Sequence, residues 1–361
     1  SSPRRIRNPG IAKNVVTVGA LLNSTASNTI ASFSSRGYTA DRRIKPNVMA
    51  PGDGTTLYSG LISAQGNTTT GYYGLYGTSM ATPAVNGAIG LIRQYLLAGY
   101  YPSGVANPAD SIKYQSAALL RAMTYVSCDP NITGFTVPDS NIGWGRINVD
   151  SVLFFSGDTR RLIIKDDTVG IGTGQSRTDS FTVTSSTIPL RVAVAWTDTA
   201  AAANASITIV NDLNVTLTAP GGATYYRGNQ YSGGQSIANP TTWDDRNVEE
   251  CFRVNSPATG TWRLTVAGQN VPSGRMRFAY AITGGIGVVG IEEKTQPLKI
   301  REEFICNTVT NRLLNIKLTL NTEKLVTIQV YDLTGRMVRQ ILNQKLSAGE
   351  HNINQKLNLP S

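Results

Sequence analysis

Apolar and polar positions in the first part of the chain alternate between strand-like and helix-like patterns. Residues 13–20 and 47–52 are short apolar runs typical of buried strands, and Pro51 is expected to break the second. From residue 80 to about 98, apolar side chains occur nearly all round the helical wheel, which predicts a helix buried on every face. A second helix is predicted over residues 116–126. Strands that alternate with helices favour an α/β domain.

The pattern changes after about residue 155, where short alternating runs recur between turns and no convincing helix appears. Several short strands at such spacing predict a β-sandwich or jelly roll. Alternation returns near the end of the chain and predicts a second, small immunoglobulin-like sandwich. The runs in the two β-rich parts are residues 190–196, 213–218, 261–267, 277–282, 314–320 and 326–331.

These patterns predict an α/β part followed by two all-β domains. The expected divisions are an α/β domain at 1–155, a jelly-roll domain at 156–285, a linker at 286–297 and a small sandwich at 298–361. The chain begins without a Met or an apolar signal core and stops abruptly after Pro360, so we expect processing or truncation at the start and truncation at the end.

Composition narrows the function classes only slightly. Of the 361 residues, 40% are hydrophobic and 16% charged, which suits a β-rich extracellular protein, and no apolar run reaches the roughly 18 residues of a membrane span. The net charge of +10 comes from scattered basic residues without interleaved aromatics, so no nucleic-acid partner is expected. Cys128, Cys251 and Cys306 lack metal-ligand spacing; either one pair is bonded and a thiol remains, or all are buried free thiols.

The segment Gly77-Thr78-Ser79-Met80 places a serine between a glycine turn and the long predicted helix. Unpaired N–H groups and the dipole at a helix N-terminus favour negative charge, such as the oxyanion of acyl transfer. Ser79 therefore suits a nucleophile whose own N–H is an oxyanion donor, with Thr78 assisting and Gly77 leaving room for substrate. The alternative, equally open from these residues alone, is that Ser79 is only a helix N-cap.

The wider string GTSMATPAVNGA, residues 77–88, resembles the nucleophile motif of the subtilisin-like serine proteases. The resemblance implies that Ser79 is the nucleophile, that Thr78 neighbours the oxyanion hole and that Gly77 and Gly10 lie near substrate, Gly10 beside the primary specificity pocket. Ala84 stands where many relatives have a histidine that is not the catalytic one. Five other segments resemble conserved segments of that family and occur in the same order along the chain as in the family. They are NPGIAKNVVTVGA, IASFSSRG, KPNVMAPGDG, SAALLRAMTYVS and IGWGRINVDSVL.

The catalytic histidine and aspartate of that family precede the serine, and this chain has neither before Ser79 in the expected context. Its only histidine, His351, lies in the last β-rich part and is interpreted as a surface residue. We therefore expect the C-terminal portion of a secreted serine endopeptidase, inactive in isolation, with the N-terminal half of the catalytic domain as a partner and peptides as substrates. The alternative is a non-catalytic extracellular structural, assembly or secretion-cargo protein with a protease-derived scaffold.

The second part, 156–285, resembles the β-jelly-roll domain of some bacterial alkaline subtilases. The matching stretches begin at Pro189, Thr241 and Ser256 and include TTWDDRNVEECF and SPATGTWRLTVAGQNVP. Relatives often bind calcium, so the resemblance suggests a calcium cofactor held by loop oxygens. Each candidate can equally be a turn-forming Asx residue. The candidates are Asp198, Asp212, Asp244, Asp245 and Asn247.

The third part, 298–361, resembles the C-terminal sorting domain of the type IX secretion system, on LNIKLTLNTEKLVTIQVYDLTGRMVRQIL and LSAGEHNINQKLNLPS. The family normally continues with one more strand. This resemblance implies outer-membrane secretion machinery as a partner and a secreted or cell-surface location. An immunoglobulin-like spacer is the alternative.

Overall fold

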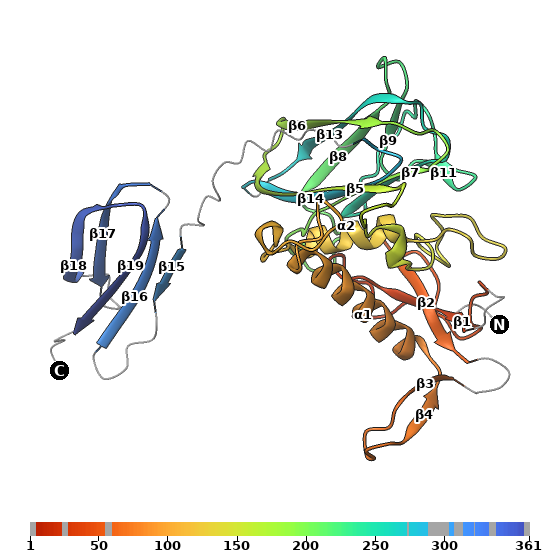
Figure 1. Ribbon diagram of the computed structural model, residues 1–361, viewed down its shortest axis with the longest axis horizontal. Helices are drawn as coiled ribbons and strands as arrows, with labels where there is room; N and C mark the ends of the chain where they lie inside the picture. Colours follow the sequence, from red (N-terminus) through yellow and green to blue (C-terminus); the bar gives the residue numbers. More distant parts are fainter. Residues whose placement is uncertain are drawn as a thin grey trace. The chain divides into compact units, whose positions relative to one another are not determined.

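The computed structural model shows the chain as two compact units, Ser1–Val289 and Gly290–Ser361, each considered by itself (Figure 1). The regular secondary structure of the described residues is mostly β-strand and includes two α-helices, which is compatible with a partial subtilase-type domain followed by β domains. No helix in this described part has the length and apolar content to cross a membrane. The structure describes residues 5–23, 28–54, 60–272, 274–287, 303–306, 313–320, 322–331 and 337–356.

The first unit begins with a two-stranded parallel sheet of β1 (Val18–Leu22) and β2 (Val48–Asp53). Strand β2 continues through Pro51 to Asp53, so the expected break is absent, but its register with β1 shifts after Pro51. An antiparallel hairpin, β3 (Leu61–Ala64) and β4 (Tyr72–Leu75), then leads into α1 (Thr78–Leu97).

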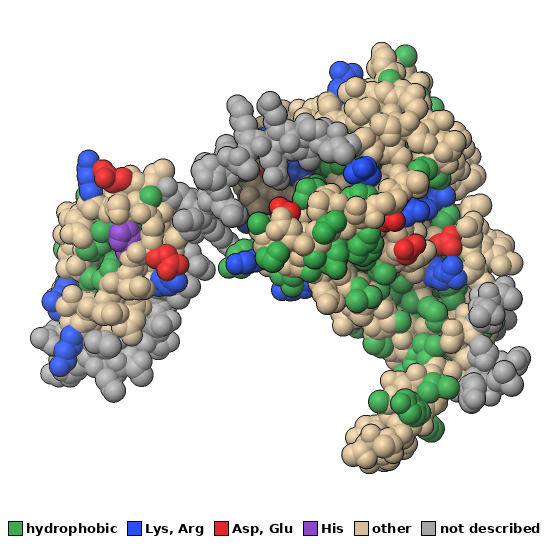
Figure 2. Space-filling view, viewed as in Figure 1, with side chains coloured by type: hydrophobic (Ala, Val, Ile, Leu, Met, Phe, Trp, Pro, Cys, Tyr) green, Lys and Arg blue, Asp and Glu red, His purple; other side chains and the backbone are tan. Residues whose placement is uncertain are grey.

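Helix α1 lies where it was predicted, but the expectation that every face is buried is wrong. Its inner face packs with β1 and β2 through Ala81, Val85 and Ile92. The opposite face is left uncovered by the described residues, with Ala84 and Leu91 exposed. Figure 2 shows apolar side chains at the surface over this region and over the β3–β4 hairpin. A helical wheel shows which faces of a helix are apolar. It does not show whether residues of the same chain or of another polypeptide cover them.

Two four-stranded antiparallel sheets form the β-sandwich of the first unit, in the orders β12-β7-β14-β5 and β6-β13-β8-β9. Their facing sides share a core that includes Trp196, Phe252 and Trp262. All four predicted strands are present as β7, β8, β13 and β14. The bounds are β5 (Arg161–Ile171), β6 (Ser176–Val183), β7 (Leu190–Ala195), β8 (Asp212–Thr218), β9 (Tyr225–Arg227), β12 (Glu249–Val254), β13 (Gly260–Asn270) and β14 (Met276–Gly284), with a small hairpin of β10 (Tyr231–Ser232) and β11 (Gln235–Ser236).

Helix α2 (Ala117–Ser127) joins the α/β part to the sandwich. It begins as predicted, since the Ser116 hydroxyl accepts from the Leu119 N–H at 3.0 Å. It packs on the outer face of β7 and β14, where Ala193 and Ala281 belong to the same core as α2 (Figure 1). The expected boundary at 155/156 therefore separates two sequence patterns within one compact unit.

The first two residues of the predicted linker 286–297 are part of the sandwich. Ile286 is buried and bridges Val183, and the Gly287 N–H donates to Thr182, so both residues belong to the sandwich. The rest of the predicted linker lies outside the described residues.

The second unit has a three-stranded sheet in the order β15-β16-β19 and the pair β17–β18. The predicted runs 314–320 and 326–331 are confirmed as strands. Leu314, Ile316 and Ile328 form part of its small core. The strands are β15 (Glu303–Cys306), β16 (Leu313–Leu320), β17 (Lys324–Tyr331), β18 (Met337–Leu346) and β19 (Gly349–Lys356).

Candidate active site

Ser79 is the second residue of α1, and the cap position belongs to Gly77. Gly77 has φ 146°, a left-handed conformation that favours glycine, and makes no side-chain cap. Its N–H donates to the Gly52 carbonyl at 2.7 Å, and its own carbonyl accepts from Met80 at 3.0 Å. The interpretation of Ser79 as an N-cap is therefore wrong, and β2 determines where the helix begins.

The start of α1 presents backbone N–H groups that can donate hydrogen bonds. The N–H groups of Thr78 and Ser79 have no acceptor within the described chain, and the first turn carries no acidic residue. Such a helix start favours an anion. The Ser79 side chain is exposed and adjoins these donors, so the segment can present a hydroxyl and stabilise an oxyanion beside it. The structure thus brings Gly77, Thr78 and Ser79 together at one helix end.

The described residues of the first unit include no histidine. The chain's single histidine, His351, lies in β19 of the second unit, where Nε2 is 2.9 Å from the Ser347 carbonyl oxygen. A serine hydroxyl is a weak nucleophile without a general base. Among the described residues of the first unit, this helix start therefore presents an exposed hydroxyl and N–H groups without a histidine beside them.

Gly10 lies on a different segment from the helix start. Its carbonyl accepts from the Thr17 hydroxyl at 2.5 Å, and a Cβ at this position would lie 3.1 Å from the Arg7 carbonyl. This close packing alone accounts for a small residue at position 10, so no bound substrate is needed to explain the glycine. A role for Gly10 in the specificity pocket stays a prediction.

A buried polar cluster of Lys45, Asn47 and Glu249, which sequence patterns did not single out, connects the strand pair to the sandwich. Lys45 Nζ donates to Asn47 Oδ1 at 2.7 Å, and Asn47 Nδ2 donates to Glu249 Oε1 at 2.9 Å. Burial lowers the pKa of Lys45 and raises that of Glu249. Asn47 also accepts from the Thr17 N–H at 2.9 Å, so β12 helps to hold β1 and β2 in place. The only feature of the sequence that could have indicated this cluster is the charged Lys-Pro-Asn segment directly before an apolar strand.

Asp198, the first calcium candidate, is occupied by protein donors. Lys13 Nζ lies 2.6 Å from Oδ2, which also accepts from the Val210 N–H at 2.8 Å. Asn211 donates its backbone N–H to Oδ1 at 2.9 Å. Asp198 thereby joins the N-terminal segment to the sandwich.

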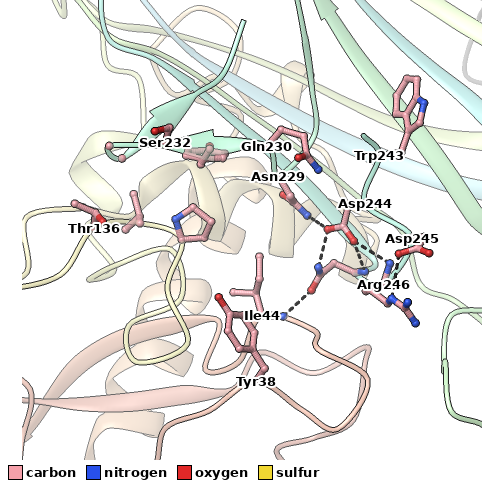
Figure 3. A pocket seen from close by; sticks show the side chains of 16 residues that line it. Tyr38, Ile44, Thr136, Asn229, Gln230, Ser232, Trp243, Asp244, Asp245 and Arg246 are labelled. Atoms are coloured by element: carbon pink, nitrogen blue, oxygen red, sulfur yellow. Dashed lines mark hydrogen bonds and ion pairs between the residues drawn. The ribbon is translucent and has the colours of Figure 1, made fainter. Parts of the chain in front are cut away.

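Three other candidates, Asp244, Asp245 and Asn247, line a pocket of about 430 Å³ between the α/β part and the sandwich of the first unit (Figure 3). Asp244 accepts from the Arg246 N–H at 2.8 Å and from Asn247 Nδ2 at 2.6 Å. Asn247 Oδ1 accepts from the Ile44 N–H at 2.8 Å, and Asp245 pairs with Arg246 at 3.0 Å. These bonds stabilise the loop.

The remaining candidate, Asp212, is the first residue of β8. Burial and then the charge of Asp244 raise the pKa of Asp212 to about 6. Across the described chain, no three His, Cys, Asp or Glu residues are arranged to hold a metal ion. Calcium stays a prediction, and the contacts of Asp198 and Asp244 give it no support.

Comparisons with known proteins relate this chain to serine proteases. Residues 2–145 match the model of the subtilase family. The serine protease/ABC transporter B family protein tagD of Dictyostelium discoideum is 29% identical over 324 residues, covering 72% of this chain and 17% of that protein. Serine protease AprX of Bacillus subtilis is 40% identical over 99 residues, 25% of this chain and 22% of AprX. Pyrolysin of Pyrococcus furiosus is 40% identical over 120 residues, 33% of this chain and 8% of pyrolysin.

The chain spans less than a quarter of the length of each of these relatives. The match to tagD covers 72% of the chain, so it extends beyond the 144 residues from 2 to 145 into the sandwich. Together the comparisons support a subtilase-type serine-protease segment at residues 2–145.

Proposed function

We propose that this chain supplies the nucleophile-bearing part of a secreted subtilisin-like serine endopeptidase. The observation that carries the proposal is the exposed Ser79 hydroxyl at a helix start whose N–H groups have no partner in the described chain. Attack of Ser79 Oγ on a peptide carbonyl forms a tetrahedral oxyanion, which these N–H groups can bind. Collapse of this intermediate breaks the peptide bond and leaves an acyl-enzyme on Ser79, which water then hydrolyses.

The base comes from a second polypeptide segment, the N-terminal half of the catalytic domain, which covers the outer face of α1. Two helical glycines on α1, Gly87 and Gly90, support this arrangement. Both are exposed and have open space where a Cβ would stand. Glycine in a helix interior costs about 1 kcal/mol relative to alanine and usually has a packing or functional reason. Close approach of another backbone is such a reason, and the exposed Leu91 adds apolar area for it.

The hairpin before Ser79 supports the same interface. Tyr72, Tyr73 and Tyr76 are 75%, 59% and 64% exposed, a concentration of aromatic surface directly beside the nucleophile. Exposed apolar patches of this kind mark interaction sites for proteins or ligands. The docked half and a bound peptide substrate can both use this surface.

The sandwich and the second unit have supporting roles in the proposal. The sandwich braces β1 and β2 through the Lys45–Asn47–Glu249 cluster. Residues 298–361 direct export by outer-membrane secretion machinery to the cell exterior, a proposal that rests on their sequence resemblance. A calcium ion in the sandwich is proposed on the same ground.

The test is labelling of the native protein with a fluorophosphonate probe, which reacts with activated serines. We expect labelling of the full chain and its loss in Ser79→Ala. Ser176→Ala is the matched control, because Ser176 is also exposed but lies in β6 of the sandwich. No labelling of a folded, complete native preparation would overturn the endopeptidase proposal.

That negative result would favour a non-catalytic extracellular structural or assembly protein. One observation supports this second candidate. The sole histidine, His351, contacts the Ser347 carbonyl oxygen through its ring nitrogen. Peptide hydrolysis by the native material with the same Ser79 dependence would exclude this second candidate.

A further inference from the structure

Two buried thiols from different parts of the first unit line one small cavity. Cys128 directly follows α2, and Cys251 belongs to β12 of the sandwich. Each residue is 4% exposed, and both thiols are free. The cavity that both line has a volume of about 30 Å³. The two side chains therefore border one common space inside the first unit.

The strand register explains how the two segments meet. The Arg191 guanidinium on β7 donates to the Cys128 carbonyl at 3.3 Å, which holds the end of α2 over that strand. Arg191 pairs with Arg253 on β12, and Cys251 stands two residues from Arg253. Residues two apart on a strand point to the same face of the sheet. Cys251 therefore faces the side on which α2 lies, and it shares a core with Cys128.

We propose that Cys128 and Cys251 form a disulfide when the chain folds under oxidising conditions, linking the subtilase-type segment covalently to the sandwich. The oxidant is a small disulfide such as oxidised glutathione. One cysteine thiolate attacks it, forming a mixed disulfide and releasing one glutathione thiolate. The second cysteine thiolate attacks the mixed disulfide and releases the other. The cysteines lose two electrons, the oxidant gains them, and the two protons end on glutathione.

The bond forms before the thiols are fully buried. Burial raises the pKa of Cys128 to about 12 and that of Cys251 well above its usual value, so little thiolate is present in the folded chain. Exchange in the native state is therefore slow, and the reduced form persists once folded. This also makes the two forms separable in an experiment.

The experiment uses the full chain carrying Cys306→Ser, which leaves only the two cysteines of the proposed pair. The chain is unfolded in urea with reductant and refolded either in a glutathione redox buffer or under reducing conditions. Free thiols are then alkylated, and the peptides are mapped by mass spectrometry. We expect a linked peptide pair containing Cys128 and Cys251 only after oxidative refolding, and a higher urea midpoint for that form.

Matched variants separate this bond from a general effect of the oxidant. In Cys128→Ser/Cys306→Ser, the oxidising and reducing preparations should have the same urea midpoint. Alkylation of both cysteines after oxidative refolding, or capture of each by glutathione alone, would overturn the proposal. If refolding fails, the wild-type chain is produced in a bacterial periplasm and alkylated before reduction. Linkage of either cysteine to Cys306 there would also overturn it.

Discussion

Gly52 is the contact between strand β2 and the start of the nucleophile helix, so a single methyl group added there should damage both stability and site. A Cβ on Gly52 would stand 2.6 Å from the Ala20 Cβ, 2.8 Å from the Gly77 carbonyl oxygen and 3.2 Å from the Ala81 Cβ. The carbonyl is backbone and cannot rotate away. Either β2 or the start of α1 must move, which also weakens the 2.7 Å hydrogen bond from Gly77 to Gly52.

The expected cost of Gly52→Ala follows from these two effects. Overpacking costs about 1–3 kcal/mol, and the weakened hydrogen bond costs about 0.5–1.5 kcal/mol, so we expect a loss of about 2–4 kcal/mol in the free energy of unfolding. Urea unfolding followed by circular dichroism measures this loss. Gly66→Ala is the matched control, because a Cβ at Gly66 meets nothing within 4 Å and should change stability by less than about 0.5 kcal/mol. Equal urea midpoints for the two variants would refute the reasoning.

Three further predictions concern buried charge and the open helix face. Gly87→Ala should raise the free energy of unfolding by about 0.5–1 kcal/mol and weaken docking of the second segment; unchanged docking in a binding titration would contradict this interface. Asp198→Ala should cost about 3–5 kcal/mol in urea unfolding, because buried Lys13 loses its partner, whereas exposed Asp245→Ala should be nearly neutral. The Asp198 loss should be equal with calcium or a chelator; a calcium-dependent loss would instead place the ion there. Burial raises the pKa of Glu250, so its contribution to stability is full below the unfolded pKa and declines as pH rises toward the folded pKa. Glu250→Gln should flatten that decline, and parallel pH profiles for variant and wild type would contradict it.

The elements with a long or regular apolar period could be predicted from the sequence. The 20-residue helix α1, α2 with its serine cap and the strands β7, β8, β13 and β14 all lie where the pattern placed them. The strands β5, β6 and β12 were not predicted, because β5 and β12 contain runs of consecutive buried residues and β6 has only two apolar residues, Phe181 and Val183. In β12, for example, four consecutive residues are buried.

Long-range contacts could not be predicted, because local patterns do not report partners far away in the sequence. Lys13 and Asp198 are 185 positions apart, and Asn47 and Glu249 are 202 apart, yet these pairs join the two segments. The candidate site shows the same limit. The serine, its helix start and the absence of a nearby histidine were visible in the sequence, but the open face of α1 was not.

Ser79 reactivity, measured with and without the polypeptide proposed to complete the site, tests the central claim most directly. The measurement is the rate of fluorophosphonate labelling of Ser79 as that Asp- and His-bearing polypeptide is titrated into the isolated chain. We expect a saturable rise in this rate on the order of 10³-fold or more, lost when the added histidine is replaced by alanine. Equal labelling rates with and without the added polypeptide, at concentrations that saturate its binding, would contradict the claim.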